Sequence, residues 1–180
     1  LFKIYNNMAC DITVGRERGC KEQVGGTSKL YLYNYLEDPF TIVDGEATAM
    51  NVLLTEVFEY DIVGDGNTLV ENMVSDRNTG TTVCTQTMTI NLIGIDATTS
   101  AQMNLLAYGF PQAVIKDRNG IYHAVGVSEG IDFTVDQNTG GARTDLSGYT
   151  LTGVSTEVTL SPKLDSATVT AFEAVIVPVP

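Results

Sequence analysis

One stretch decides the fold: TVCTQTMTINLIGI, residues 82–95, in which polar and apolar side chains alternate. One side carries Cys84, Gln86, Met88, Ile90 and Leu92, and the other carries Thr85, Thr87, Thr89 and Asn91. A period of two is the mark of a half-buried β-strand. At about 3.3 Å per residue such a strand would span roughly 45 Å, far more than the usual five or six residues do. We therefore expect much of it to project beyond its own core.

A second alternating run precedes this strand and predicts its partner. It begins at Val52–Tyr60 and continues to Val74, and the turn Asp76-Arg77-Asn78-Thr79-Gly80 separates it from residues 82–95. Asp, Asn and Gly are the residues that tight turns favour. The pattern predicts a long hairpin over Leu53–Ile95 whose tip lies at Asp76–Gly80, with Thr81 and Thr82 beside it.

Good helix formers gather in one window, and we predict a single helix over about Ala97–Tyr108. Asp96 or Thr98 can accept the free amides of its first turn, and Gly109 ends it. A helix of about three turns needs docking to be stable. We expect Met103, Leu106 and Tyr108 to dock it over an open face or edge of the β-structure.

The remaining segments have a β composition. Residues 29–37 (KLYLYNYLE) alternate, and we expect the face with Tyr31, Tyr33 and Tyr35 to keep its hydroxyls near water and to pack under a loop or against another subunit. Further strands are predicted at Met50–Tyr60, Gln112–Lys116, Ile121–Val127, Ile131–Val135, Tyr149–Leu160 and Thr168–Val177. The prediction is one mainly-β domain over residues 1–180, a sandwich or barrel with one flanking helix. Residues 1–9 would be an N-terminal extension and residues 161–180 a C-terminal arm.

The charge balance argues against tight nucleic-acid binding. Ten basic and 22 acidic residues give a net charge of −12, whereas a protein that grips phosphates needs the opposite balance. The acidity is compatible with a surface past which a polyanion slides, and simple solubility explains it equally well. No apolar run is long enough to span a bilayer, and Leu1–Asn7 does not resemble a secretory signal. Three cysteines without CxxC spacing give no disulfide framework, and a reducing cytoplasm is the expected compartment for synthesis.

Side chains that perform catalysis are scarce, and we expect no enzyme, no metal and no cofactor. The single histidine, His123, lacks metal-ligand or triad partners at diagnostic spacing, which favours an exposed or edge-strand residue. Cys84 is expected as a small core hydrophobe, and a Cys10–Cys20 bridge is the less favoured reading of the other two cysteines. Gly64-Asp65-Gly66-Asn67 has oxygen-rich side chains but lacks the calcium-loop pattern, so turn chemistry is favoured.

Four stretches, taken in order, resemble a known family. They are ENMVSDRNTGTT at residues 71–82, TMTINL at 87–92, LLAYGFPQ at 105–112 and DLSGYTLTG at 145–153. Over roughly residues 10–157 the chain resembles structural proteins of tailed phages of Bacteroidota-type hosts, similar in layout to tail tube proteins.

The resemblance implies a tube protomer in the virion. Six copies would form a ring, the inner strands of neighbours would join into one lumen barrel, and rings would stack through the long hairpin and the chain termini. Its partners would be further copies, other tail proteins and DNA in transit, with no membrane. Thr85, Thr87, Thr89 and Asn91 would lie on the lumen strands, and we expect the lumen to carry acidic and small polar side chains.

Two other readings remain open. A different virion β-protein, such as a capsid decoration or head-fibre subunit, would occur as trimers or monomers on a shell. A ligand-binding β-sandwich would use the three tyrosines of residues 31–35 as its platform.

Overall fold

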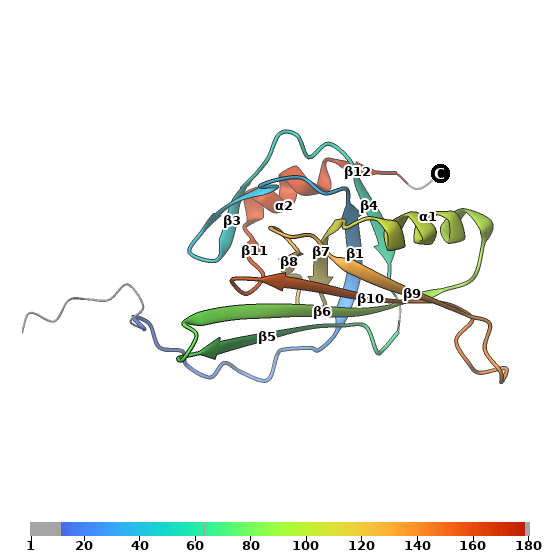
Figure 1. Cartoon of the computed structure of the whole chain (residues 1–180), viewed down its shortest axis with the longest axis horizontal. Coiled ribbons are helices and arrows are strands. Elements are labelled where there is room, and N and C mark those ends of the chain that lie inside the picture. The colour runs from blue at the N-terminus through green and yellow to red at the C-terminus, as the bar shows by residue number, and fades with distance from the viewer. Residues whose placement is uncertain (1–11, 63, 179–180) are drawn as a thin grey trace, which may run out of the picture.

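The computed structural model describes residues 12–62 and 64–178, which build two β-sheets and two helices (Figure 1). The smaller sheet has four strands in the order β5-β6-β10-β9, and every neighbouring pair is antiparallel. Its strands are β5 (Thr68–Asp76), β6 (Thr81–Ile93), β10 (Gly148–Glu157) and β9 (Asp132–Asn138).

The larger sheet has eight strands in the order β12-β4-β1-β7-β8-β11-β3-β2. Their bounds are β1 (Thr27–Tyr33), β2 (Phe40–Val43), β3 (Glu46–Met50), β4 (Val57–Asp61), β7 (Gln112–Asp117), β8 (Tyr122–Val125), β11 (Lys163–Leu164) and β12 (Ile176–Val177). The helices are α1 (Ala97–Tyr108) and α2 (Ser166–Glu173). The predicted mainly-β sandwich with a flanking helix is confirmed, although a second helix is present.

Two hydrophobic clusters lie on opposite faces of the larger sheet. The first fills the space between the sheets and beside α1, and it includes Leu30, Met88 and Leu151. The second lies between the larger sheet and α2 and includes Tyr31 and Phe172. The centre of the larger sheet is therefore buried on both faces, which explains why β1 is apolar at consecutive positions.

The tyrosine prediction for β1 is wrong in part. Tyr31 and Tyr33 are only 2% and 1% exposed and belong to the second cluster of the chain's own core. Tyr35, beyond the end of the strand, is 42% exposed. Tyr31 packs edge-to-face on Phe172 of α2, and Tyr33 packs edge-to-face on Phe40 of β2, so elements of the chain itself cover these two rings.

The single strand predicted over Met50–Tyr60 is interrupted. The amide of Leu53 donates to Asn51 Oδ1 at 3.0 Å, and the amide of Leu54 donates to the Asn51 carbonyl at 3.0 Å. This local turn separates β3 from β4, and β4 pairs with β1 in the larger sheet. The hairpin is therefore β5–β6, residues 68–93, and not Leu53–Ile95.

The predicted terminal strand Thr168–Val177 is also wrong, since most of it is helix α2. Asp165 caps the helix by accepting the amide of Thr168 at 2.7 Å. Thr168 and Phe172, one helical turn apart, are 2% and 0% exposed. Residues 161–178 consequently form part of the body of the molecule and are not an arm, while the extension predicted at residues 1–9 lies outside the described residues.

Candidate assembly interface

The β5–β6 hairpin ends in the turn that the sequence predicts. Pairing runs from Thr68 opposite Thr89 to Asp76 opposite Thr81. The amide of Asn78 donates to Asp76 Oδ1 at 2.7 Å, and the amide of Gly80 donates to the Asp76 carbonyl at 2.9 Å. Gly80 has φ +69°, a conformation that glycine adopts at little cost. The predicted tip residues, which are Asp76, Arg77, Asn78, Thr79, Gly80, Thr81 and Thr82, lie together at this exposed end.

The overhang of the hairpin is shorter than expected. One face of β6 is buried from Cys84 (0% exposed) to Leu92 (8%), because Met88, Ile90 and Leu92 pack in the core between the sheets. Toward the turn, only residues 81–83 of β6 lie beyond this buried stretch. There Val74 and Val83 stand opposite each other and are 58% and 39% exposed.

The face of the smaller sheet that points away from the core is rich in threonine and also carries exposed apolar residues, which are Val70, Val74, Val83, Ile93 and Val154. Thr85, Thr87, Thr89 and Asn91 alternate with buried residues and are half-exposed on this face, as the pattern predicts. The register aligns Thr68, Thr89, Thr152 and Thr134 in one row across all four strands. We call this surface the outer threonine face.

Its charged residues are all acidic. By strand parity, Asp76, Asp132 and Asp136 belong to the outer threonine face. None of the residues that β5, β6, β9 and β10 place on this face is Lys, Arg or His. A phosphate-binding surface has the opposite composition.

Both edges of the smaller sheet are open. Within the described residues β5 pairs only with β6, and β9 pairs only with β10. An unpaired strand edge presents a row of amides and carbonyls that can template pairing with another chain. These edges, which the sequence could not locate, are the strongest structural indication of a contact surface.

Helix α1 has the predicted bounds, but only two of its three predicted docking residues contact the core. Met103 and Leu106 are 3% and 8% exposed, whereas Tyr108 is 88% exposed and does not dock the helix. Tyr149 of β10 supplies the missing contact: its hydroxyl lies 2.6 Å from Ser100 Oγ and donates to the Asp96 carbonyl at 3.1 Å. Asp96 caps the helix by accepting the amide of Thr99 at 2.8 Å.

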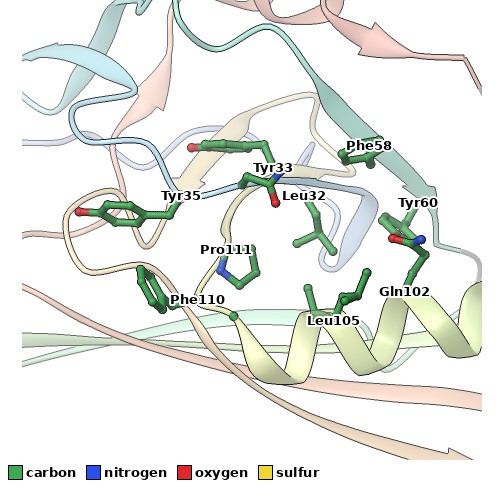
Figure 2. Close-up of a pocket in the computed structure, with 12 residues that line it drawn as sticks. Leu32, Tyr33, Tyr35, Phe58, Tyr60, Gln102, Leu105, Phe110 and Pro111 are labelled. Carbon is green, nitrogen blue, oxygen red and sulfur yellow. The ribbon is translucent and has the colours of Figure 1, made fainter.

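An apolar groove of about 440 Å³ lies between α1 and strands β1 and β4 (Figure 2). Its rim includes Leu105 and Phe110, which are 64% and 55% exposed, and the ring of Tyr35 stands against that of Phe110 at 5.3 Å. Contiguous exposed apolar surface of this kind commonly marks a protein–protein contact.

The other chemical candidates are accounted for by local structure, with one exception. Cys84 is fully buried, and burial raises the pKa of its thiol, as fits a core residue. In the Gly64–Asn67 loop, Arg118 donates to the Gly64 carbonyl at 2.7 Å and pairs with Asp65, so a guanidinium already provides the positive charge. The exception is His123 of β8, which is neither exposed nor on an edge strand. Strand β8 lies between β7 and β11 in the larger sheet, and the His123 side chain is 18% exposed.

Three other features considered in the sequence are a disulfide bridge, a metal site and a membrane span. The Cys10–Cys20 bridge involves a residue outside the described part of the chain. Within residues 12–62 and 64–178 no three His, Cys, Asp or Glu side chains are grouped as metal ligands. Neither helix of that part has the length and hydropathy of a bilayer-spanning segment.

Comparison with known proteins returned no match to a protein-family model, to a curated protein or to a solved structure.

Proposed function

We propose that this chain is a structural protomer of a phage tail tube, which assembles into stacked hexameric rings around a channel for DNA. The observation that carries the proposal is the four-stranded sheet with two open edges. A subunit with two such edges can pair with a copy on each side, and closure of a ring removes every edge.

The strand directions support a continuous barrel. All pairs within the smaller sheet are antiparallel, and the sheet has an even number of strands. Its edge strands β5 and β9 therefore run in opposite directions, so β5 of one copy would meet β9 of the next in antiparallel pairing. Six copies would supply 24 strands, four from each. With about 4.8 Å between strands and a tilt of about 40°, the backbone wall would be roughly 48 Å across, wider than a DNA duplex.

The composition of the outer threonine face supports its assignment to the channel. The threonine, asparagine, aspartate and apolar side chains of this face offer a DNA backbone no positive charge, whereas each Lys or Arg contact with phosphate adds affinity. A wall of this kind repels DNA weakly and lets it slide. The exposed apolar residues of the hairpin tip and of the groove beside α1 would be covered by contacts between copies.

Electron microscopy of the purified protein over a range of concentrations tests the proposal. We expect rings of six subunits and hollow tubes. Protein that remains a solitary monomer under all conditions would overturn the proposal. Trimers or monomers that decorate a shell would support the alternative virion protein instead.

A hairpin variant separates stacking from folding. Replacing residues 76–81 by Asn-Gly closes the hairpin at the Ser75–Thr82 pair with a favoured two-residue turn. We expect folded subunits or single rings that do not form tubes. Tubes of normal length from this variant would show that the hairpin tip is not the stacking contact. A matched variant in the exposed 139–147 loop, Arg143→Ser, should still stack.

A further inference from the structure

The apolar groove beside α1 has two walls that face each other (Figure 2). Leu105 and Leu106 belong to the helix wall, and Phe58 and Tyr60 belong to the strand wall. Leu105 is 64% exposed and Phe58 is 40% exposed, so both walls are accessible. None of the residues that line the groove is charged. The groove therefore fits an insert that is apolar on both of its faces.

The end of the β5–β6 hairpin, residues 73–83, has that composition. Val74 and Val83 stand opposite each other on the outer threonine face and are 58% and 39% exposed. Met73 belongs to the other face by strand parity and is 46% exposed. We call residues 73–83 the hairpin end. It can remove apolar surface from water on both faces at once only by entering between two apolar walls.

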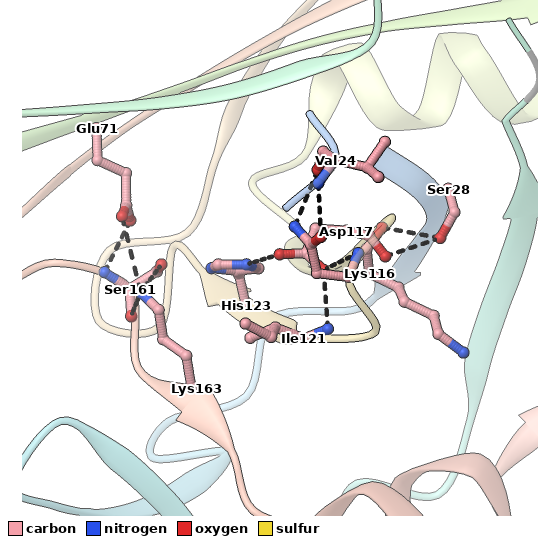
Figure 3. Close-up of polar contacts among 10 residues, drawn as sticks. Val24, Ser28, Glu71, Lys116, Asp117, Ile121, His123, Ser161 and Lys163 are labelled. Atoms are coloured by element: carbon pink, nitrogen blue, oxygen red, sulfur yellow. Dashed lines mark hydrogen bonds and ion pairs between the residues drawn. The ribbon is translucent and has the colours of Figure 1, made fainter. Parts of the chain in front are cut away.

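Contacts at its base direct the hairpin end away from the core. Figure 3 shows Glu71 of β5 reaching toward Ser161, whose amide donates to Glu71 Oε1 at 2.7 Å. Glu71 Oε2 also lies 4.0 Å from Nζ of Lys163 in the larger sheet. These contacts join β5 to the rest of the molecule two residues before Met73. The hairpin end is consequently presented on an anchored strand.

The hairpin end also carries an isolated positive charge. Arg77 lies in its turn, is exposed, and is the only Lys or Arg in residues 30–115. No ion pair joins Arg77 to another residue in the described part of the chain. Its guanidinium is therefore available to a carboxylate of another molecule.

Exposed carboxylates lie next to one rim of the groove. Glu37 comes two residues after Tyr35, which lines the groove, and is exposed. The Tyr35 hydroxyl donates to the carbonyl of Ser128 at 2.9 Å, and the next residue, Glu129, is also exposed. This rim therefore complements the charge of an arginine.

The lysines of the neighbouring strands lie away from the groove. Lys29 of β1 pairs with Lys116 of β7 at one end of these strands, whereas Tyr33, which lines the groove, pairs with Gln112 at the other end. Helix α1 has no charged residue. An arginine that approaches this end of the sheet is thus attracted by carboxylates without repulsion from either lysine.

The hairpin end and the groove lie at opposite ends of the molecule. In Figure 1 the turn between β5 and β6 is at the left, and α1, which forms one wall of the groove, is at the right. A chain therefore cannot fill its own groove with its own hairpin. Between two copies the contact is heterologous and leaves one hairpin end and one groove free, so it repeats in one direction.

We propose that the groove beside α1 receives the hairpin end of a second copy, with Met73, Val74 and Val83 between its walls and Arg77 beside the acidic rim. The inference deepens the proposed function and rests on the part of it in which copies associate through the hairpin. It assigns the surface that the hairpin of the next copy contacts.

Cross-linking between two variants tests this contact. A ¹⁵N-labelled Val74→Cys chain and an unlabelled Leu105→Cys chain, both with Cys10→Ser and Cys20→Ser, are mixed and treated with a short bismaleimide. We expect mass spectrometry to find a labelled peptide with residue 74 linked to an unlabelled peptide with residue 105. Val70→Cys is the matched control, because Val70 is also 58% exposed on β5 but lies outside the hairpin end, and it should not link to residue 105.

The outcomes separate the contact from the proposed function. Equal linking from positions 70 and 74 would show random collision, and an absence of the 74–105 link would show that the groove is not the receptor; either result overturns the inference. Hexameric rings and tubes without the link would leave the proposed function standing. The link without rings of six would support the contact and remove the tail-tube function.

Substitution of Arg77 tests the orientation of the hairpin end. Arg77→Glu should raise the protein concentration needed for half-maximal 74–105 linking about fivefold at low salt, the equivalent of one exposed ion pair. Arg77→Lys keeps the charge and should link like the unsubstituted hairpin. An unchanged concentration dependence for Arg77→Glu would overturn the placement of Arg77 beside the acidic rim.

Discussion

At the scale of single residues, hydrogen bonds to carboxylates shape the turns of this protein. Asp145 is an example in the loop between β9 and β10: its Oδ2 accepts the amides of Ala142 at 2.7 Å and Gly141 at 3.0 Å. These two bonds favour the charged form and lower the pKa of Asp145 below its usual value. The folded loop therefore binds a proton less readily than the unfolded chain.

This gives the direction of a pH effect on stability. A carboxyl group whose pKa is lowered by folding stabilises the protein above its unfolded pKa of about 3.9, and this contribution disappears as the pH falls through the lower folded value. We expect Asp145→Asn to flatten the decline of the melting temperature below about pH 4 relative to the unchanged protein. Melting curves from pH 2.5 to pH 6 measure this. Asp136→Asn, on the exposed outer face, serves as the control, and an identical flattening by that variant would contradict the assignment.

At the scale of elements, short segments acquire their structure from what they pack against. Helix α2 has eight residues, too few to be stable alone. Its Phe172 is fully buried and contacts Tyr31 edge-to-face at 5.4 Å and Phe40 at 6.3 Å. The helix is therefore held by one aromatic cluster on the face of the larger sheet that lies away from the smaller sheet.

Removing that aromatic anchor tests whether the C-terminal residues belong to the body of the fold. We expect Phe172→Ala to lower the free energy of unfolding by about 3–5 kcal/mol, the usual cost of deleting a buried phenyl ring. Urea denaturation followed by circular dichroism measures it. Phe110→Ala, at a position 55% exposed, should cost far less. A loss below about 1 kcal/mol for Phe172→Ala would restore the prediction of a C-terminal arm over residues 161–180.

At the scale of the whole molecule, two features act together: open edges at β5 and β9, and an outer face without cationic side chains in the strands between them. In the proposed assembly, the open edges would pair with other copies, and the outer threonine face would line the channel. The proposed function requires both, and they can be perturbed separately.

A cation placed on the outer threonine face probes what that face encloses. Thr89 is half-exposed in the row of four threonines, so Thr89→Arg should leave folding and tube formation intact. Six added positive charges per proposed ring should make the tubes retain duplex DNA at low salt and release it at high salt. Co-sedimentation with labelled DNA measures this, with Thr89→Gln as the matched control. Tubes of the Arg variant that bind no more DNA than the Gln variant would place this face away from the channel.

The sequence by itself determined the features that depend on local periodicity. The alternation at residues 84–92, the turn at Asp76–Gly80 and the helix at Ala97–Tyr108 were all predicted with their correct positions. These features depend on residues that are close together in the sequence, so the period of the side chains and the turn residues predict them without the tertiary structure. The function proposed from the resemblance remains a prediction.

Only the tertiary structure decided the features that depend on residues far apart in the chain. It assigned β4 and β5 to different sheets, covered Tyr31 with α2, and gave the docking role to Tyr149 in place of Tyr108. It also placed His123 beside a cavity under an edge strand. Contacts between distant segments determine which residues are buried and which strands are neighbours. An alternating pattern predicts which residues share a face of a strand, but it does not predict what covers that face.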